Sequence, residues 1–227
     1  MREFILRENV RRFQEHLATE TDSRVRQTLR ELLNAAQREL ALLTAQEHGL
    51  DRRDPRVTNF FGAPKLLAHE FVEKFEGSTA PSLLLDPRAG LHIVDANAPY
   101  AAATMTMASA IAGQRLFEVF PDNPDDPGAD GVSQLFASLT IAAKTGEQHV
   151  MAVQRYDVRD HEGRFVERYW QPMNTPIFDD NGAILFLLHQ VEDVTRRFVR
   201  RPRRNRVPAD GSAAGDAVRQ ETGRRSA

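Results

Sequence analysis

Residues 148–195 read QHVMAVQRYDVRDHEGRFVERYWQPMNTPIFDDNGAILFLLHQVEDVT, and this stretch decides the fold. It holds three runs rich in Val, Tyr, Phe and Ile, separated by turn signals at Asp160–Gly163 and Asp179–Gly182. Side chains of these types favour strands, and Asp or Asn before Gly favours a tight reversal between antiparallel strands. The stretch therefore predicts an antiparallel meander of three strands.

Composition is typical of a soluble globular protein. The 227 residues leave room for one domain of ordinary size with appendages. A net charge of −2 gives no overall attraction to nucleic acid or to an anionic membrane. No signal-peptide core and no run of about 18 uncharged apolar residues occur, so we expect a cytoplasmic protein without a membrane-spanning helix.

The chain has no cysteine. This excludes disulfides, a thiolate nucleophile and any cysteine-based metal site. It also excludes a photosensor that bonds its flavin to a cysteine. The sequence lacks common enzyme motifs as well, among them G-x-S-x-G, a phosphate-binding glycine loop and H-E-x-x-H. We therefore expect no enzymatic activity.

Residues 1–49 are predicted to form a helical hairpin. Apolar residues recur at helical spacing through residues 2–18 and again over residues 24–48. Asp22 is a suitable N-cap for the second helix, and Gly49 is a suitable end. Neither helix has enough apolar surface to be stable alone. Three alternatives stay open: the pair packs on itself, on the following domain, or on a second copy as a coiled coil.

Residues 50–79 are predicted to be a linker and a short helix, which begins at Pro64 and ends at Gly77. The next domain is predicted to span residues 80–195. Before the three-strand meander we expect a hairpin over Ser82–Asp95, a helix cap at Asn97, a helical piece over Thr104–Ala112 and a helix over Gly131–Thr145.

This order of elements resembles that of a PAS domain, a sensory and dimerisation module of signalling proteins. The resemblance is carried by Asp95–Ala96–Asn97, by Gly113–Pro121 and by the closing Glu192–Thr195. The segments PDNPDDPG at 121–128 and RYWQPMNTP at 168–176 are similar to PAS domains found ahead of bacterial histidine kinases. The resemblance implies an α+β, PAS fold: a five-stranded antiparallel sheet with helices on one face, and the preceding short helix across the outer face.

The resemblance also implies a ligand cavity between the sheet and the helices. By similarity to flavin-binding PAS domains, the last strand turns Leu187, His189 and Val191 inward, and the strand before it turns Trp170, Pro172 and Asn174 inward. The candidate ligand-binding residues are Trp170, Asn174, Leu187, His189, Val191, Leu135 and Leu139. An apolar wall with few polar groups is typical of a small-molecule site. The alternative is a filled core in which the polar groups satisfy one another.

No cofactor is assigned. Haem-binding PAS domains carry the axial histidine on the helix that corresponds to Gly131–Thr145, which has no histidine, so the sequence disfavours b-type haem. A flavin that acts through redox chemistry stays open. His69–Glu70 is similar to the phospho-accepting pair of histidine kinases but lacks the following Pro, which indicates a surface residue. The aspartates of residues 122–130 lack EF-hand spacing and indicate turns rather than a metal site.

The expected function is that of a cytoplasmic PAS sensor in signal transduction of the two-component type. It binds a small ligand or a partner and relays the change through its sheet and flanking helices to residues 192–197. The alternative is a ligand-free module that homodimerises or docks onto a separate histidine kinase. Residues 196–227 begin with an arginine run and are too poor in apolar residues to fold, so we expect a disordered tail. A weaker alternative gives these arginines a contact with nucleic acid.

Overall fold

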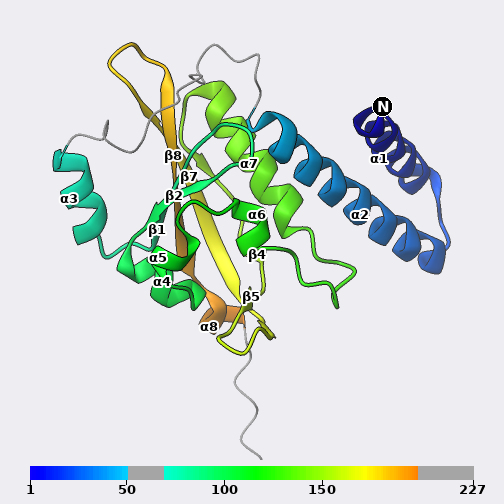
Figure 1. Ribbon diagram of the computed structural model, residues 1–227. Coiled ribbons are helices and arrows are strands. Elements are labelled where there is room, and N and C mark those ends of the chain that lie inside the picture. The colour runs from blue at the N-terminus through cyan, green and yellow to red at the C-terminus, as the bar shows by residue number, and fades with distance from the viewer. Residues whose placement is uncertain (51–68, 199–227) are drawn as a thin grey trace, which may run out of the picture.

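The computed structural model describes residues 1–50 and 69–198 (Figure 1). The predicted linker, the helix start at Pro64 and the tail from residue 199 onward lie outside the described residues. The side chains of His69 and Glu70 are likewise outside the description, so the prediction made for that pair stays a prediction.

The N-terminal helical hairpin consists of α1 (Arg2–Thr19) and α2 (Ser23–His48), as predicted. A carboxylate oxygen of Asp22 accepts hydrogen bonds from the backbone N–H groups of Arg24 and Val25, at 2.8 and 3.1 Å. This satisfies two donors that the first turn leaves unpaired. Gly49 ends α2 with φ +65°, a left-handed conformation that glycine adopts without strain.

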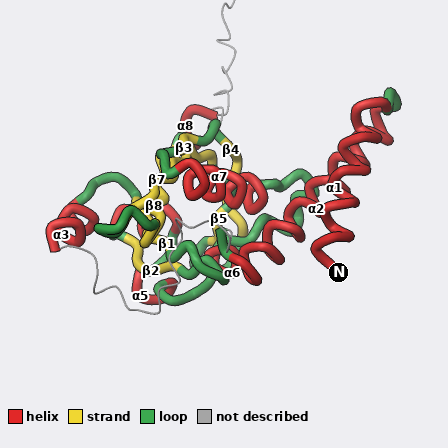
Figure 2. Tube along the Cα trace, turned by 90° about the horizontal axis from the view of Figure 1, so that it is seen from above, coloured by secondary structure: helices red, strands yellow, loops and turns green. Residues whose placement is uncertain are grey.

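The hairpin packs both on itself and on the following domain. Helix α2 lies alongside α7 (Gly131–Thr145), with α1 on the far side of α2 (Figures 1 and 2). Ala41, Ala45 and Leu50 belong to the same buried cluster as the domain core. Of the three predicted alternatives, packing of the hairpin on itself and packing on the following domain are both observed.

The domain is built on an antiparallel sheet whose strand order is β2-β1-β8-β7-β3, with β4 also paired to β7. The strands are β1 (Ser82–Leu85), β2 (Ile93–Ala96), β3 (His149–Val150), β4 (Gln154–Arg155), β7 (Tyr169–Phe178) and β8 (Ile184–Asp193). Helices that cover one face of the sheet join its first two strands to the other four. This arrangement is the PAS fold, and it confirms the predicted fold class.

The first strand of the predicted meander was expected to be continuous, which is wrong. It is interrupted between β3 and β4, and the turn at Asp160–Gly163 closes a separate hairpin of β5 (Val158–Arg159) and β6 (Phe165–Val166). The cause lies in β7, where Pro172 stands opposite the interruption. The backbone N–H of Met151 donates to the carbonyl of Pro172 at 2.9 Å, but Pro172 has no N–H to return the bond.

The connecting helices are α4 (Ala98–Thr104), α5 (Ala108–Ile111), α6 (Leu116–Val119) and α7. The helical piece predicted over Thr104–Ala112 is wrong in its middle, because Met105 takes a left-handed conformation (φ 56°) and ends α4. Residues 106 and 107 are not helical, and α5 begins at Ala108.

The outer face of the sheet is covered by α3 (His69–Gly77), as the resemblance implies (Figure 1). Phe75 of α3 packs with Leu84 of β1 and Phe186 of β8 in a second buried cluster. At the other end of the domain, β8 leads into the short helix α8 (Thr195–Phe198), whose Phe198 ring stacks on Tyr169 at 4.8 Å. The disordered tail predicted from residue 196 was therefore placed too early, because this stacking orders residues 196–198. Across the described part of the chain, no helix is both long and apolar enough to cross a membrane.

Asn97 connects the start of the sheet to the first inner helix. Its side-chain oxygen accepts from the backbone N–H of Ser82 at 2.9 Å and from that of Tyr100 at 3.0 Å. Its amide nitrogen donates to the carbonyl of Ala80 at 2.9 Å. The predicted cap is confirmed, and the same side chain also holds the beginning of β1.

We predict that Asn97→Ala lowers the free energy of unfolding by about 1–3 kcal/mol, because buried backbone N–H groups lose their acceptor. Urea unfolding followed by circular dichroism measures this. Gln14→Ala on the exposed face of α1 is the control and should unfold like the wild type. Equal stability of the Asn97 variant and the wild type would contradict this role of the side chain.

Candidate functional site

A small cavity lies between the inner face of the sheet and the helices. Its volume is about 40 Å³, and its lining residues are Tyr100, Thr104, Leu116, Phe120, Leu135, Gln154, Tyr156, Val158, Trp170, Pro172, His189 and Val191. A buried water needs roughly 10–15 Å³ of such space and occupies about 30 Å³ in the liquid. The cavity thus has room for a water or two, whereas ligand pockets for drug-sized molecules measure about 300–1,000 Å³. A flavin or a haem does not fit without movement of the walls.

The predicted site residues divide into two groups. Trp170, His189, Val191 and Leu135 line the cavity. The remaining three, Asn174, Leu187 and Leu139, are completely buried beside it but are not among the residues that line it.

The indole of Trp170 does not join the other polar groups. Its Nε1–H donates to the backbone carbonyl of Tyr156 at 2.8 Å, which links β7 to the segment after β4. Tyr156 in turn donates from its hydroxyl to the carbonyl of Phe120. Trp170 and His189 thus line the same cavity, but only Asn174 is hydrogen-bonded to His189.

Asn174 and His189 begin a chain of four buried or half-buried polar side chains. Nδ1 of His189 lies 2.7 Å from Oδ1 of Asn174. Nδ2 of Asn174 donates to Oγ of Ser138 at 2.7 Å, and Oγ of Ser138 lies 2.7 Å from Nδ1 of His149. The hydrogen bonds among these side chains agree with the alternative of a filled core, in which buried polar groups satisfy one another. The cavity beside His189 agrees with the alternative of a small-molecule site.

Ser138 and His149 were not among the sequence-derived candidates. Ser138 lies on the buried face of α7, where a small polar residue gives no periodic signal among Leu135, Leu139 and Ala142. His149 stands directly opposite Asn174 in the pairing of β3 with β7. The four groups come into contact because of this strand register, which cannot be read from the sequence alone.

Burial determines the charge of the aromatic groups at the cavity. It lowers the pKa of His189 to about 4, because the imidazolium form would lose its hydration. It also raises the pKa of the Tyr100 hydroxyl, whose ring meets that of His189 edge to face at 6.2 Å. Both groups are therefore neutral near pH 7. Since Nδ1 of His189 is engaged by Asn174, Nε2 is the nitrogen left to contact an occupant of the cavity.

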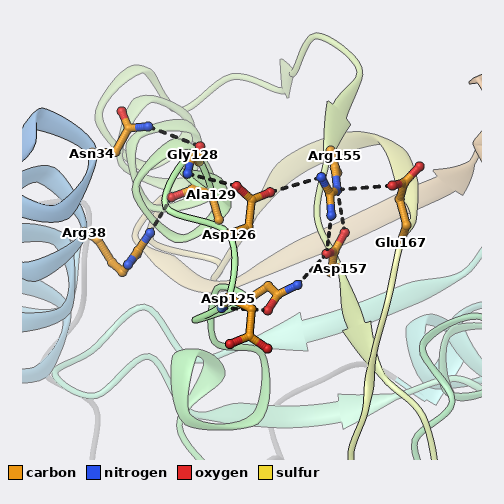
Figure 3. Close-up of polar contacts among 10 residues, drawn as sticks. Asn34, Arg38, Asp125, Asp126, Gly128, Ala129, Arg155, Asp157 and Glu167 are labelled. Atoms are coloured by element: carbon orange, nitrogen blue, oxygen red, sulfur yellow. Dashed lines mark hydrogen bonds and ion pairs between the residues drawn. The ribbon is translucent and has the colours of Figure 1, made fainter. Parts of the chain in front are cut away.

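A network of ion pairs connects the 122–130 loop to its surroundings (Figure 3). Arg155 contacts Asp126 at 3.0 Å, Asp157 at 2.7 Å and Glu167 at 3.8 Å. Burial alone would raise the pKa of Asp157, but its bonds from Arg155 and Asn123 outweigh this and lower it. These acids serve as ion-pair partners and turn formers.

The same loop attaches α2 to the domain. Arg38 forms an ion pair with Asp122 at 2.6 Å and donates to the carbonyl of Ala129, and Asn34 donates to the carbonyl of Gly128 at 3.1 Å (Figure 3 shows the two carbonyl contacts). Asp122 also accepts from the backbone N–H of Val132 at 2.9 Å, in the first turn of α7. One buried carboxylate thus holds two helices.

Within the described residues, one group of side chains could hold a metal ion: Glu3, Glu47 and His48. Arg7 already pairs with Glu3 at 2.6 Å, and it lowers the pKa of that carboxyl by a hydrogen bond that outweighs burial. The group lies where the hairpin joins the domain, and none of its residues lines the cavity. We assign no metal to it.

Comparison with known proteins concerns the fold. No family model and no curated protein matches the chain. A PAS domain from Colwellia psychrerythraea aligns over 56% of this chain and 97% of its own, at 15% identity and a TM-score of 0.43. The Rhodobacter sphaeroides LOV protein aligns over 57% and 70%, at 16% identity and a TM-score of 0.43. The PAS domain of nitrogen regulation protein NR(II) from Vibrio parahaemolyticus aligns over 56% and 100%, at 18% identity and a TM-score of 0.40. The fold assignment rests on the strand order described above.

The pKa of His189 predicts how stability depends on pH. The folded pKa of about 4 lies below the ~6.5 of an unfolded histidine, so between these values the unfolded chain binds the extra proton. The contribution of His189 is therefore complete above about pH 6.5 and is lost as the pH falls toward 4, by at most about 1.4 kcal/mol per pH unit.

Urea unfolding of the wild type and of His189→Gln over this pH range measures the effect. The difference between their slopes should equal the loss of about one bound proton on folding. His161→Gln, at an exposed turn, is the control and should keep the wild-type slope. The same slope in the His189 variant and the wild type would refute the assignment.

Proposed function

We propose that this protein is a cytoplasmic signalling protein whose PAS-fold domain binds a small ligand and relays its presence through the sheet and the flanking helices. The observation that supports the proposal is the cavity on the inner face of the sheet, with one nitrogen of the neutral His189 left for an occupant. Apolar walls with a few polar groups are typical of ligand sites. The present volume suits water or a very small ligand, and a larger one requires the walls to move.

Strand β8 offers a route from the cavity to the end of the domain. His189 and Val191 line the cavity, and only one residue separates the end of this strand from α8. The backbone N–H of Val194 donates to the carbonyl of Tyr169 at 2.9 Å, and Phe198 stacks on the same residue. A shift of β8 relative to β7 would therefore displace α8.

A second route leads to the N-terminal hairpin. Helix α7 contributes Leu135 to the cavity wall, and its first turn is held by Asp122, the carboxylate that pairs with Arg38 of α2. A displacement of α7 is thus transmitted to α2 through packing and through this ion pair.

An exposed stripe on α2 supports a partner for the hairpin. Seven exposed positions follow one another in alternating steps of three and four, which is the heptad spacing of a coiled-coil seam: Val25, Thr28, Leu32, Ala35, Glu39, Leu42 and Gln46. Val25, Leu32 and Leu42 are 38–45% exposed. We propose that a second copy of the chain covers this stripe. In the alternative function, the stripe and the sheet serve a ligand-free module that docks onto a separate histidine kinase.

We predict that native mass spectrometry of freshly purified protein detects a bound small molecule. Leu135→Phe extends a side chain into the cavity and should remove the additional mass, at a cost of about 1–3 kcal/mol in stability. Ile141→Phe, on the exposed side of the same helix, is the matched control and should retain it. A wild-type protein without additional mass, or a mass retained in the Leu135 variant, would favour the ligand-free module.

We also predict that the wild-type protein sediments as a dimer. Replacing both Leu32 and Leu42 by Asp places charges in the seam and should give a monomer with an unchanged circular dichroism spectrum. Ile141→Asp introduces a charge on α7 instead and should remain dimeric. A monomeric wild type, or a dimeric double variant, would show that the seam does not bind a second copy.

A further inference from the structure

The polar chain found inside the domain has one end in the cavity and the other in a surface groove. His189 lines the cavity. At the opposite end, Ser138 and His149 line an open groove of about 670 Å³ between the 122–130 loop, α7 and the β3–β4 edge. Ser138, Asn174 and His189 are at least nine-tenths buried, and His149 is half-buried. Three contacts of 2.7 Å join the four side chains.

Two arrangements of hydrogen atoms satisfy this chain without moving its heavy atoms appreciably. In the first, Nδ1–H of His189 donates to Oδ1 of Asn174, whose Nδ2 donates to Ser138, whose hydroxyl donates to Nδ1 of His149. In the second, the Asn174 amide is turned over and every donor becomes an acceptor. Met151 favours the first, because its sulfur lies 3.8 Å from Nδ2 of Asn174 and accepts weakly from it.

We propose that this chain is a two-state relay, in which protonation of His149 in the groove reverses the hydrogen-bonding character of His189 in the cavity. A protonated imidazole carries hydrogen on both nitrogens and can only donate. Ser138 must then accept from His149 and direct its own hydroxyl to Asn174. The amide turns over, its nitrogen donates to Nδ1 of His189, and the hydrogen of His189 has to reside on Nε2.

The proton balance of this step is simple. One proton from solvent is bound by His149. His189 changes its tautomer by exchange with water that enters the cavity: water takes the hydrogen from Nδ1 as the Asn174 amide turns and supplies the hydrogen on Nε2, so the charge of His189 does not change. This agrees with its burial, which disfavours the cationic form. No buried charge is created, and all four groups keep their partners.

The surroundings of His149 are mainly acidic. The groove it lines also holds the carboxylates of the loop and of the β4–β5 connection, together with one guanidinium: Asp122, Asp126, Asp130, Asp157 and Arg155. Of these, Asp126 and Asp157 pair with Arg155, and Asp122 pairs with Arg38. The adjacent ends of α7 and β3 add Lys144 and Glu147. Histidine is the side chain whose ordinary titration falls near neutral pH.

The relay specifies which ligands the cavity accepts, and this consequence rests on the proposed ligand site. With His149 neutral, Nε2 of His189 presents a lone pair, so the cavity suits a small molecule with an O–H or N–H group. With His149 protonated, Nε2 carries hydrogen, and the cavity suits a carbonyl or ether oxygen. Acidification therefore replaces one class of ligand by the other.

The relay can be tested without any ligand, by ¹⁵N NMR of the histidine rings in the full-length protein. Spectra are recorded from about pH 8 to about pH 5.5, a range that brackets the ordinary histidine pKa of ~6.5. At the high-pH end of this range we expect His189 to carry its hydrogen on Nδ1. When His149 becomes protonated, the ¹⁵N shifts of the two ring nitrogens of His189 should interchange. Because this readout does not depend on ligand binding, it can succeed even if mass spectrometry finds no ligand.

Variants separate the relay from a general effect of pH. His149→Phe removes the titrating group, and Ser138→Ala breaks the chain, so either should make the tautomer of His189 independent of pH. His161→Gln is the control and should leave the interchange intact. If Ser138→Ala does not fold, the His149 variant decides alone. A His189 tautomer that stays on Nδ1 through the titration of His149, or that changes equally in His149→Phe, would overturn the proposal.

Discussion

The register between β7 and β8 is the constraint on which the interior of this domain depends. The two strands pair over nearly their whole length, and Asn174 stands directly opposite His189. The turn at Asp179–Gly182 determines this register, since the backbone of Asp179 pairs with Ala183 at 2.8 Å and Gly182 takes φ +79°. A slip of one residue would turn every inward side chain of β8 to the outer face. The cavity wall, the polar pair and the contact with α3 all follow from this alignment.

Within this register, the polar interior has to be satisfied. Among the described residues, no side-chain nitrogen or oxygen that is completely enclosed by protein lacks a hydrogen-bond partner, while Nε2 of His189 faces the cavity. The cost of an unpaired buried polar group is about 1–3 kcal/mol, so Asn174 and His189 are stable inside the core only as members of a chain. That chain reaches the surface because Ser138 of α7 and His149 of β3 continue it. The hydrogen bonds that satisfy the buried polar groups of the core therefore also connect the cavity to the groove.

The N-terminal hairpin is attached by a different kind of interaction. Ala41 and Ala45 allow α2 to approach the domain core closely, and the Arg38–Asp122 pair orients it. Because the Asp122 carboxylate is almost completely buried, removing either partner leaves an uncompensated charge or an unpaired donor. The hairpin is therefore coupled to α7 while the heptad-spaced stripe of α2 stays exposed.

The sequence by itself determined most of the elements and several of their ends. Asp22 and Asn97 were recognisable as caps because capping depends on neighbours within a few residues. Strand alternation placed every second side chain of β7 and β8 on one face, and the resemblance to PAS domains implied which face turns inward. Only the tertiary structure decided which groups meet. Ser138, His149, Asn174 and His189 come from three strands and a helix, and pairing with Pro172 broke an edge strand that looked continuous. Local preferences act over a few residues, whereas these contacts depend on the register and packing of the whole sheet, which no short stretch of sequence contains.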